Sequence, residues 1–416
     1  MAGFAGVQPR APTTVTDMVL SRSGLASLVT LFLVACGNLT VLQPDRLSPR
    51  SPPQLLQDGV EALVRPVLAQ RETPGLVLGL LDRDGPPRFF SFGRGEQSGG
   101  ELGPDTLFPI GSLSKGFVAG LLALLVDEGL MRWEDSLAEL LPAEHLSPDA
   151  ARITLLQLAT HSGGLPRQPY DLGLLADLTR FSFTGHNFSQ RMDGTQLRDF
   201  LAGFRAPPAA RPQYSNIGYA LIGWAIETRC KETLPSLLRR KLLRPLGLYN
   251  TGYLPEDLPS HSHRAQGHVG DQPKFMRRGA PVADWQFPAA LHGAAGLYSS
   301  ARDLLAFAAA HRCNPTNPGN CPTRLHAVLA DNLQVRIPQP EDAPGIGWVT
   351  DLFDGLALTN QVGMAVGHTS YLGIDRAHGR AAVVLQTSFN WNFKIGHALL
   401  QRLARGQIVV DGLTAP

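Results

Sequence analysis

The chain has 416 residues, of which 44% are hydrophobic and 17% charged, a balance typical of globular proteins rather than disordered or fibrous ones. The formal net charge is only +2, so no strong field draws the protein to nucleic acid or to anionic lipid, and we predict no nucleic-acid partner. A chain of this length can bury a large core and still form a deep cleft.

The N-terminus has the pattern of an export signal. Arg22 precedes an apolar stretch, residues 25–35, which ends in small residues before Cys36. The stretch is too short to span a bilayer comfortably as a helix. Residues 1–17 are unrelated to this pattern, which makes Met18 a candidate start of translation.

Leu33-Val-Ala-Cys36 resembles a bacterial lipobox, and this resemblance implies that Cys36 is lipidated and becomes the new N-terminus. An ordinary cleaved signal is the alternative. We therefore predict a signal peptide over residues 1–36. The expected localisation is the bacterial cell envelope, with a lipid anchor in the membrane and the protein facing the periplasm or the cell exterior.

The segment after Cys36 is rich in Pro and Ser and cannot form a core. We predict a tether over residues 37–56, a folded domain over 57–407 and a tail over 408–416.

At the start of this domain, apolar residues 76–81 and 88–92 flank a turn-rich segment, a pattern that predicts a β-hairpin. Residues 112–128 are apolar nearly all round, which predicts a buried central helix.

The start of that helix carries a Ser-x-x-Lys motif, Ser112-Leu-Ser-Lys115. Positions i and i+3 share a helix face, so the Lys115 amine can reach the Ser112 hydroxyl. The helix N-terminus favours negative charge that develops beside it. Burial would lower the pKa of the lysine and make it a base near neutral pH. The alternative is an ordinary helix start with a solvated lysine.

The middle of the chain, residues 130–330, shows helical patterns broken by Pro and Gly. Tyr214-Ser215-Asn216 follows a Pro-rich loop and precedes an apolar helix. Tyr214 could act as an acid or base if neighbouring positive charge lowers its pKa, and the Asn216 amide could hold a substrate carbonyl. Alone, Ser215 and Asn216 would simply cap the helix.

Cys313 and Cys321 bracket a turn-rich loop and could form a disulfide in an oxidising compartment, or could be two unrelated loop cysteines. Cys230 lies in an apolar helical pattern and is expected to be a buried free thiol.

Strand patterns return at residues 345–350, 365–374 and 381–386, and an amphipathic helix follows at 393–403. Strands at both ends of the domain do not alternate with helices as βαβ units do. They predict an α+β fold in which an antiparallel sheet, formed from both ends of the chain and flanked by helices, receives an inserted helical region.

The second of these strands contains His368-Thr369-Ser370-Tyr371. A strand beside a cleft can present side chains at alternate positions and backbone N–H groups to a substrate. A single histidine in a strand is more often a structural residue.

In this order, the three motifs resemble those of the serine β-lactamase/D-Ala-D-Ala peptidase superfamily, in the branch of class C β-lactamases and class C penicillin-binding proteins. Two further segments are similar to family segments, Leu155–Pro166 and His292–Leu304. The resemblance covers roughly residues 60–405. It implies a β-lactamase/transpeptidase-like fold.

The resemblance also implies roles for the motif residues. Ser112 would attack the substrate carbonyl, and Lys115 and Tyr214 would manage its proton, with the identity of the base left open. Asn216, His368, Thr369 and Tyr371 would bind substrate, and the N–H groups of Ser112 and Tyr371 would form the oxyanion hole. Ser370 stands where the family usually has Gly, a departure that leaves the substrate open.

Other chemistries lack support. His261, His263 and His268 have no accompanying carboxylate pattern, so we predict no metal site and no cofactor. A G-x-S-x-G nucleophile elbow is also missing.

We therefore predict an exported serine acyl-hydrolase that acts on peptidoglycan D-Ala-D-Ala peptides or another small acyl substrate, as a carboxypeptidase or endopeptidase. The alternatives are an esterase or β-lactamase of the same fold, and a non-catalytic penicillin-binding sensor. The sequence leaves the oligomeric state open.

Overall fold

The computed structural model describes residues 56–69, 73–83, 85–208, 211–314, 321–391 and 394–408, all within one structural unit, residues 39–416. The predicted signal peptide, Cys36 and nearly all of the predicted tether lie outside these residues. No helix among the residues described is long and apolar enough to cross a membrane.

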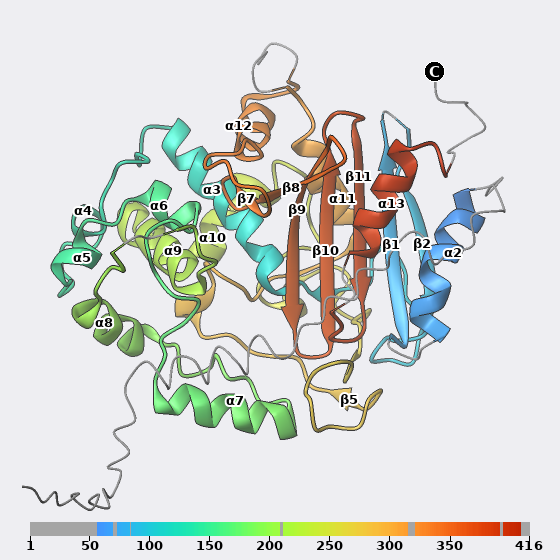
Figure 1. Ribbon diagram of the computed structural model, residues 1–416, viewed down its shortest axis with the longest axis horizontal. Coiled ribbons are helices and arrows are strands. Elements are labelled where there is room, and N and C mark those ends of the chain that lie inside the picture. Colours follow the sequence, from blue (N-terminus) through green and yellow to red (C-terminus); the bar gives the residue numbers. More distant parts are fainter. Residues whose placement is uncertain are drawn as a thin grey trace, which may run out of the picture. The chain divides into compact units, whose positions relative to one another are not determined.

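A seven-stranded antiparallel sheet forms the centre of this unit, in the order β2-β1-β11-β10-β9-β8-β7 (Figure 1). N-terminal β1 pairs with C-terminal β11, with Leu76 opposite Gln386, so the sheet is built from both ends of the chain as predicted. The strands are β1 (Gly75–Asp82), β2 (Arg88–Gly93), β7 (Ala343–Pro344), β8 (Val349–Phe353), β9 (Leu356–Ala365), β10 (His368–Asp375) and β11 (Arg380–Gln386).

Two short pairs of strands lie outside the main sheet. They are β3 (Phe108–Pro109) with β6 (Tyr298–Ser299), and β4 (Gly267–His268) with β5 (Pro281–Val282).

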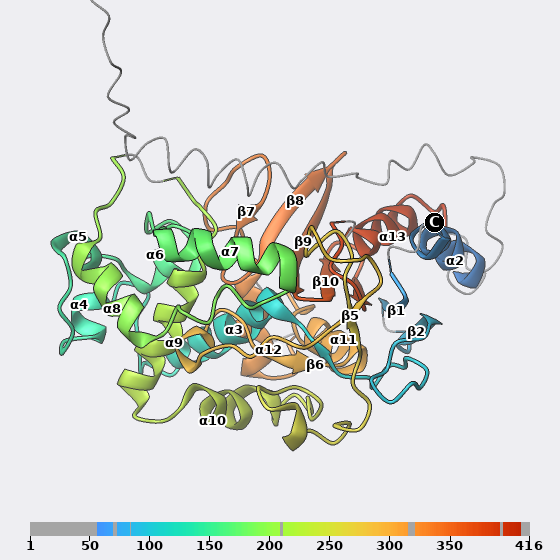
Figure 2. The ribbon, with the colours of Figure 1, turned by 90° about the horizontal axis from the view of Figure 1, so that it is seen from below.

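Helices cover both faces of the sheet. The residues of strands β1, β10 and β11 are therefore buried along nearly the whole length of each strand. One face packs on α2 (Leu56–Ala69) and α13 (Ile395–Ala404) through a single apolar cluster. The other packs on α3 (Ser114–Asp127) and α11 (Ala301–Ala310), as Figure 2 shows. The α+β prediction is confirmed.

The remaining helices belong to the inserted region between β2 and β7, on the side of the sheet that α3 occupies (Figures 1 and 2). They are α4 (Leu137–Leu140), α5 (Pro148–Ala151), α6 (Leu155–Ala159), α7 (Leu172–Thr184), α8 (Gly194–Gly203), α9 (Asn216–Cys230), α10 (Leu234–Leu238) and α12 (Arg324–Asn332).

The central helix α3 lies between the inserted region and the sheet. Every residue from Ser114 to Leu125 is buried, which explains why the sequence is apolar nearly all round. A short 3-10 turn, Gly111–Leu113, leads into it and lies against β9. The molecule therefore places Ser112 where the sheet, the central helix and the inserted region meet.

Candidate active site

Ser112 lies in the 3-10 turn directly before α3, which we call the Ser112 turn (residues 111–113). Gly111 has a φ of +52°, and a Cβ there would lie 2.6 Å from the carbonyl oxygen and 2.7 Å from the amide nitrogen of Met364 on β9. Only glycine permits both this backbone and this approach. Ser112 itself is half-buried, and its amide N–H donates to no other described residue.

The Ser114 side chain holds the Ser112 turn in place through two hydrogen bonds. Its hydroxyl donates to the Gly111 carbonyl over 2.7 Å and accepts the Leu297 N–H over 3.2 Å. The Ile110 N–H in turn donates to the Leu297 carbonyl over 2.9 Å. The turn thus has a fixed position relative to α3 and to the segment that leads into α11.

Lys115 lies one turn later and is fully buried. Its Nζ donates to Asn216 Oδ1 over 2.9 Å and to the Ala294 carbonyl oxygen over 2.8 Å. The same atom lies 4.8 Å from the centre of the Tyr214 ring. The structure therefore brings Lys115, Tyr214 and Asn216 together beside Ser112, although they lie about 100 residues apart in the sequence.

The Tyr214–Asn216 segment is held by the loop that follows α6. The Ser215 hydroxyl caps α9 by accepting the Gly218 N–H over 3.0 Å, and it donates to the Pro166 carbonyl over 2.8 Å. The Ser215 N–H donates to Nδ1 of His161, whose carbonyl accepts the Gln213 N–H. His161 is thus a positioning residue for Tyr214.

The Nδ1 of His161 must be unprotonated to accept the Ser215 N–H. Burial, assisted by the nearby Lys115 charge, lowers the pKa of His161 to about 3. The imidazole therefore stays neutral at physiological pH and holds the Tyr214 segment throughout the range in which an enzyme would act.

The electrostatics suit proton transfer. Burial lowers the pKa of the Lys115 ammonium below its ordinary value. For Tyr214, burial opposes ionisation, but the positive charges of Lys115 and Arg167 outweigh it and lower the pKa of the phenol. Both groups can therefore give up a proton more easily than in water, and either can receive one from Ser112.

The strand that approaches the Ser112 turn is β9, and it supplies a second N–H group. β8 pairs with β9 only as far as Asn360, so the edge of β9 beyond that residue is open. The Val362 N–H points to this edge, because it donates to the Gln361 side chain rather than to β10. Met364, two residues on, presents its N–H to the same edge, beside Gly111.

Gly363 allows this approach, since a Cβ there would lie 1.8 Å from the Ile110 carbonyl oxygen. The N–H groups of Ser112 and Met364 are therefore placed to bind one oxyanion between the turn and the strand.

The predicted oxyanion-hole role of Tyr371 is wrong. Tyr371 lies on β10, an interior strand paired with β9 on one side and β11 on the other, so its backbone N–H belongs to the sheet. Its side chain is fully buried on the α13 face, where the hydroxyl lies 2.7 Å from Nδ1 of His397. Neither part of Tyr371 can reach a substrate at Ser112.

His368 and Thr369 are also structural, contrary to the prediction that they bind substrate. His368 is 1% exposed, and its Nε2 lies 3.3 Å from Oδ1 of Asp284. The Thr369 hydroxyl donates to the Ser388 carbonyl over 2.9 Å. Ser370 does contact the site indirectly, because its hydroxyl donates to the Ile110 carbonyl behind the Ser112 turn over 2.8 Å.

The segment beside Ser112 is instead Gln361-Val362-Gly363, which keeps only the glycine of the K-T-G pattern. The Gln361 amide donates to the Gly347 carbonyl over 2.8 Å, and its Oε1 accepts the Val362 N–H over 3.0 Å. Gln361 is neutral and engaged with the backbone. The segment Gln361-Val362-Gly363, all of which the structure describes, therefore offers no cation beside Ser112.

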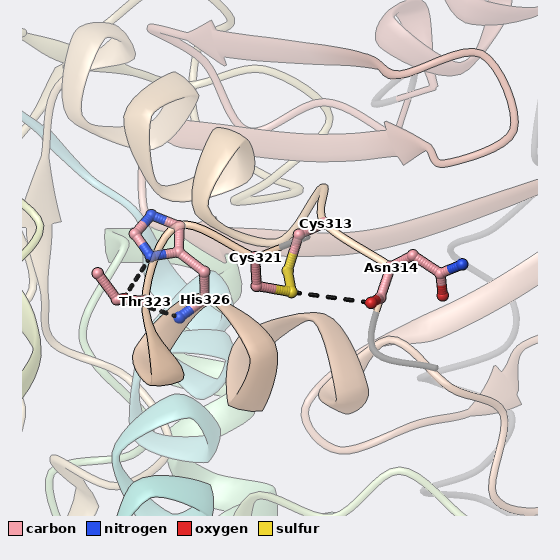
Figure 3. Close-up of a disulfide and its surroundings, with 5 residues drawn as sticks. All are labelled: Cys313, Asn314, Cys321, Thr323 and His326. Carbon is pink, nitrogen blue, oxygen red and sulfur yellow. Dashed lines mark hydrogen bonds between the residues drawn. A yellow bond between two sulfur atoms is a disulfide. The ribbon is translucent and has the colours of Figure 1, made fainter. Parts of the chain in front are cut away.

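The structure joins Cys313 and Cys321 by a disulfide with a Cα–Cα distance of 5.2 Å (Figure 3). Cys230 is free but only half-buried rather than buried. Within the described ranges, no three His, Cys, Asp or Glu side chains gather as metal ligands. His263 instead lies 3.4 Å from Glu96, and His268 contacts the Thr387 carbonyl.

The model of the family described as Beta-lactamase matches residues 60–405 of this chain. The chain belongs to this family. D-alanyl-D-alanine-carboxypeptidase/endopeptidase AmpH of Escherichia coli (strain K12) is 26% identical over 314 residues, which cover 72% of this chain and 75% of AmpH. A beta-lactamase of Lysobacter lactamgenus is 27% identical over 286 residues, 68% of this chain and 65% of that protein.

A third relative is the unguisins hydrolase ungD' of Aspergillus campestris (strain IBT 28561), which is 30% identical over 227 residues. The match covers 51% of this chain and only 39% of that hydrolase. Members of the family among these relatives are thus hydrolases of several kinds, and the chain is a serine hydrolase of the same type.

Solved structures show the same fold. The class C beta-lactamase of Rhodobacter sphaeroides superposes with a TM-score of 0.68 at 22% identity, over 83% of this chain and 99% of the other. The beta-lactamase/D-alanine carboxypeptidase of Pseudomonas syringae has the same TM-score at 20% identity, over 83% and 98%. The family match confirms the predicted β-lactamase superfamily, and these structures confirm the predicted β-lactamase/transpeptidase-like fold.

Proposed function

We propose that this enzyme hydrolyses amide or ester bonds through an acyl-enzyme on Ser112. The observation that carries the proposal is the buried Lys115 ammonium, held between Asn216 and Ala294 beneath the Tyr214 ring. A buried lysine that pairs with no carboxylate among the described residues is costly, and here it lies where a deprotonated amine has a chemical use.

The acylation step follows from this arrangement. The Ser112 oxygen forms a bond to the substrate carbonyl carbon while its proton passes to Lys115 or Tyr214. The carbonyl oxygen becomes an oxyanion between the N–H groups of Ser112 and Met364, each of which typically contributes about 3 kcal/mol to the transition state. When the intermediate collapses, the same proton moves to the leaving amine or alkoxide.

Deacylation repeats these roles with water. A water molecule gives a proton to the Lys115–Tyr214 pair and bonds to the acyl carbon, and the proton returns to the Ser112 oxygen as it leaves. The Asn216 amide nitrogen donates to no described residue, so it remains available to hold the substrate carbonyl.

For the substrate, we infer a peptidoglycan peptide that ends in D-Ala-D-Ala, with carboxypeptidase or endopeptidase activity. The similarity to AmpH, whose name carries both activities, supports this substrate class. An esterase is the second candidate, and the neutral Gln361 beside Ser112 is the observation that favours it.

One set of assays separates these activities. The soluble domain and its Ser112→Ala variant are incubated with a fluorescent penicillin, and D-alanine release from a muropeptide and hydrolysis of a nitrophenyl ester are measured in parallel. We expect Ser112-dependent labelling with D-alanine release. Ester hydrolysis without D-alanine release would establish the esterase. No labelling and no turnover by the wild type would contradict the acyl-enzyme.

We also propose that the protein is exported and lipid-anchored through Cys36. The lipobox-like sequence and the Cys313–Cys321 disulfide, which is characteristic of oxidising compartments, support this proposal. Cys36→Ser should release the protein from the membrane fraction. Continued retention of the variant in that fraction would count against the anchor.

A further inference from the structure

Arg167 is an exposed cation at the site without an ion-pair partner. It follows Pro166 in the loop after α6, and no carboxylate among the residues described pairs with it. Its guanidinium lies 5.2 Å from the centre of the Tyr214 ring. A guanidinium that stacks on an aromatic face keeps its N–H donors free in the plane, where they can bind a planar anion.

The backbone of Arg167 has a fixed position relative to the site. The Asn216 N–H donates to the Arg167 carbonyl over 3.0 Å, and the neighbouring Pro166 carbonyl accepts the Ser215 hydroxyl over 2.8 Å. The backbone at Pro166 and Arg167 is therefore tied to Ser215 and Asn216, the two residues that follow Tyr214. This is the geometry of a binding residue rather than of a free surface arginine.

Its charge also acts on the groups that move the proton. Among the described residues, the positive charges of Lys115 and Arg167 both act on Tyr214 and lower its pKa. The charge of Arg167 also lowers the pKa of Lys115. On β9, Gln361 is neutral, and its side-chain amide is already bonded to the Gly347 carbonyl and the Val362 N–H. Arg167 is thus an exposed cation beside Tyr214 that an anionic group of the substrate can meet.

We propose that Arg167 binds a carboxylate of the substrate and so makes this a site for amides or esters that carry a carboxylate next to the bond to be cleaved. The inference rests on the proposed acyl-transfer function and deepens it. Peptides with a free C-terminal carboxylate belong to this class, whereas simple neutral esters do not. The guanidinium can take such a carboxylate through two parallel N–H···O bonds.

Two matched esters test the proposal. One is the acetyl-D-alanyl ester of 3-hydroxybenzoic acid, and the other is the ester of 3-hydroxybenzamide, which replaces the carboxylate by a neutral group of similar shape. kcat and KM are measured for the wild type, Arg167→Ala and Arg167→Lys. Arg65→Ala on α2, whose side chain is 78% exposed and forms only an i,i+4 pair, is the matched control for the loss of one positive charge.

We expect Arg167→Ala to lower the ratio of kcat/KM for the carboxylate ester to that for the amide ester by about 10- to 100-fold, the usual effect of losing a hydrogen bond to a charged group. The change should lie mainly in KM. Arg167→Lys should recover part of the wild-type ratio, and Arg65→Ala should keep the wild-type ratio. Using the ratio removes any effect of Arg167 on Tyr214, because both esters share that effect.

Binding provides a second measurement that needs no turnover. In the Ser112→Ala background, calorimetry compares N-acetyl-D-Ala-D-Ala with its C-terminal amide, with and without Arg167→Ala. An unchanged preference in both assays would overturn the role of Arg167 while leaving the acyl-enzyme intact. If the wild type hydrolyses neither ester, the proposed function fails, and the binding assay still decides whether Arg167 recognises a carboxylate.

Discussion

Replacing Gly363 by alanine tests whether β9 forms one wall of the active site. A Cβ at this position would lie 1.8 Å from the Ile110 carbonyl oxygen and 2.5 Å from the Ser370 hydroxyl, whereas real Cβ contacts are essentially never shorter than 3.0 Å. The serine hydroxyl can rotate away, but the carbonyl belongs to the backbone. The strand and the Ser112 turn must therefore separate by about 1 Å, a displacement that can cost about 100-fold in rate.

Because Met364 directly follows Gly363, the same displacement moves its N–H away from the oxyanion. Loss of one such donor lowers kcat by about 100- to 1,000-fold, so we expect a fall of at least about 100-fold in kcat/KM. Overpacking should also cost about 1–3 kcal/mol of stability, so thermal unfolding is recorded beside the kinetics.

Gly203→Ala is the matched control, since nothing lies within 4 Å of a Cβ at that position at the end of α8. It should keep wild-type activity. If folded Gly363→Ala hydrolyses a nitrophenyl ester within about threefold of the wild-type rate, where a 1 Å displacement should cost about 100-fold, β9 is not part of the site.

Three further variants test other parts of the account. Lys115→Met should lower kcat/KM for ester hydrolysis by about 100- to 10,000-fold, because it removes a proton acceptor. It should not lower the melting temperature, because it also removes a costly buried amine. Full activity of the variant would exclude Lys115 from proton transfer. Tyr371→Phe should leave kcat/KM unchanged. It should lower the free energy of unfolding in urea by about 1–3 kcal/mol, because His397 loses its hydrogen-bond partner. A loss of activity without a loss of stability would show that Tyr371 takes part in the active site. Burial lowers the pKa of His311 to about 4. Between about pH 6.5 and pH 4, therefore, only the unfolded chain binds a proton at this residue, and the free energy of unfolding should fall as the pH falls through this range. His311→Gln should remove about 3 kcal/mol of that loss between pH 7 and pH 4, and an unchanged pH slope would contradict the buried neutral histidine.

Ser112, Lys115, Tyr214 and Asn216 could be located from the sequence because each lies at the start of a helix with a clear apolar pattern. The Ser-x-x-Lys spacing and the capping residue Ser215 are local features, so they survive without knowledge of the fold. The strands at both chain ends were predictable for the same reason, since their buried runs are continuous.

The third motif was misplaced because its position depends on the order of strands in the sheet. His368-Thr369-Ser370 matches the expected letters, but β10 is interior, whereas the polar β9 lies against the Ser112 turn. Asn360 and Gln361 are buried polar residues, and their side chains donate to Asp351 and to the Gly347 carbonyl. Because they are polar, the strand shows no continuous hydrophobic pattern in the sequence. A glycine within a strand often marks close approach of another backbone, and Gly363 was the available signal.

Arg167 and His161 were beyond sequence reasoning. Their roles follow from contacts with Tyr214 and Ser215, about 50 residues away in the chain. Only the fold brings these segments together.

The central claim is that Ser112 becomes acylated. The enzyme is mixed with a penicillin, quenched in acid within seconds and digested, and the peptide that contains residues 111–115 is sequenced by mass spectrometry. We predict that the mass of the opened penicillin is attached at Ser112 and is missing from Ser112→Ala. An adduct on another residue, or one that persists in Ser112→Ala, would contradict the account.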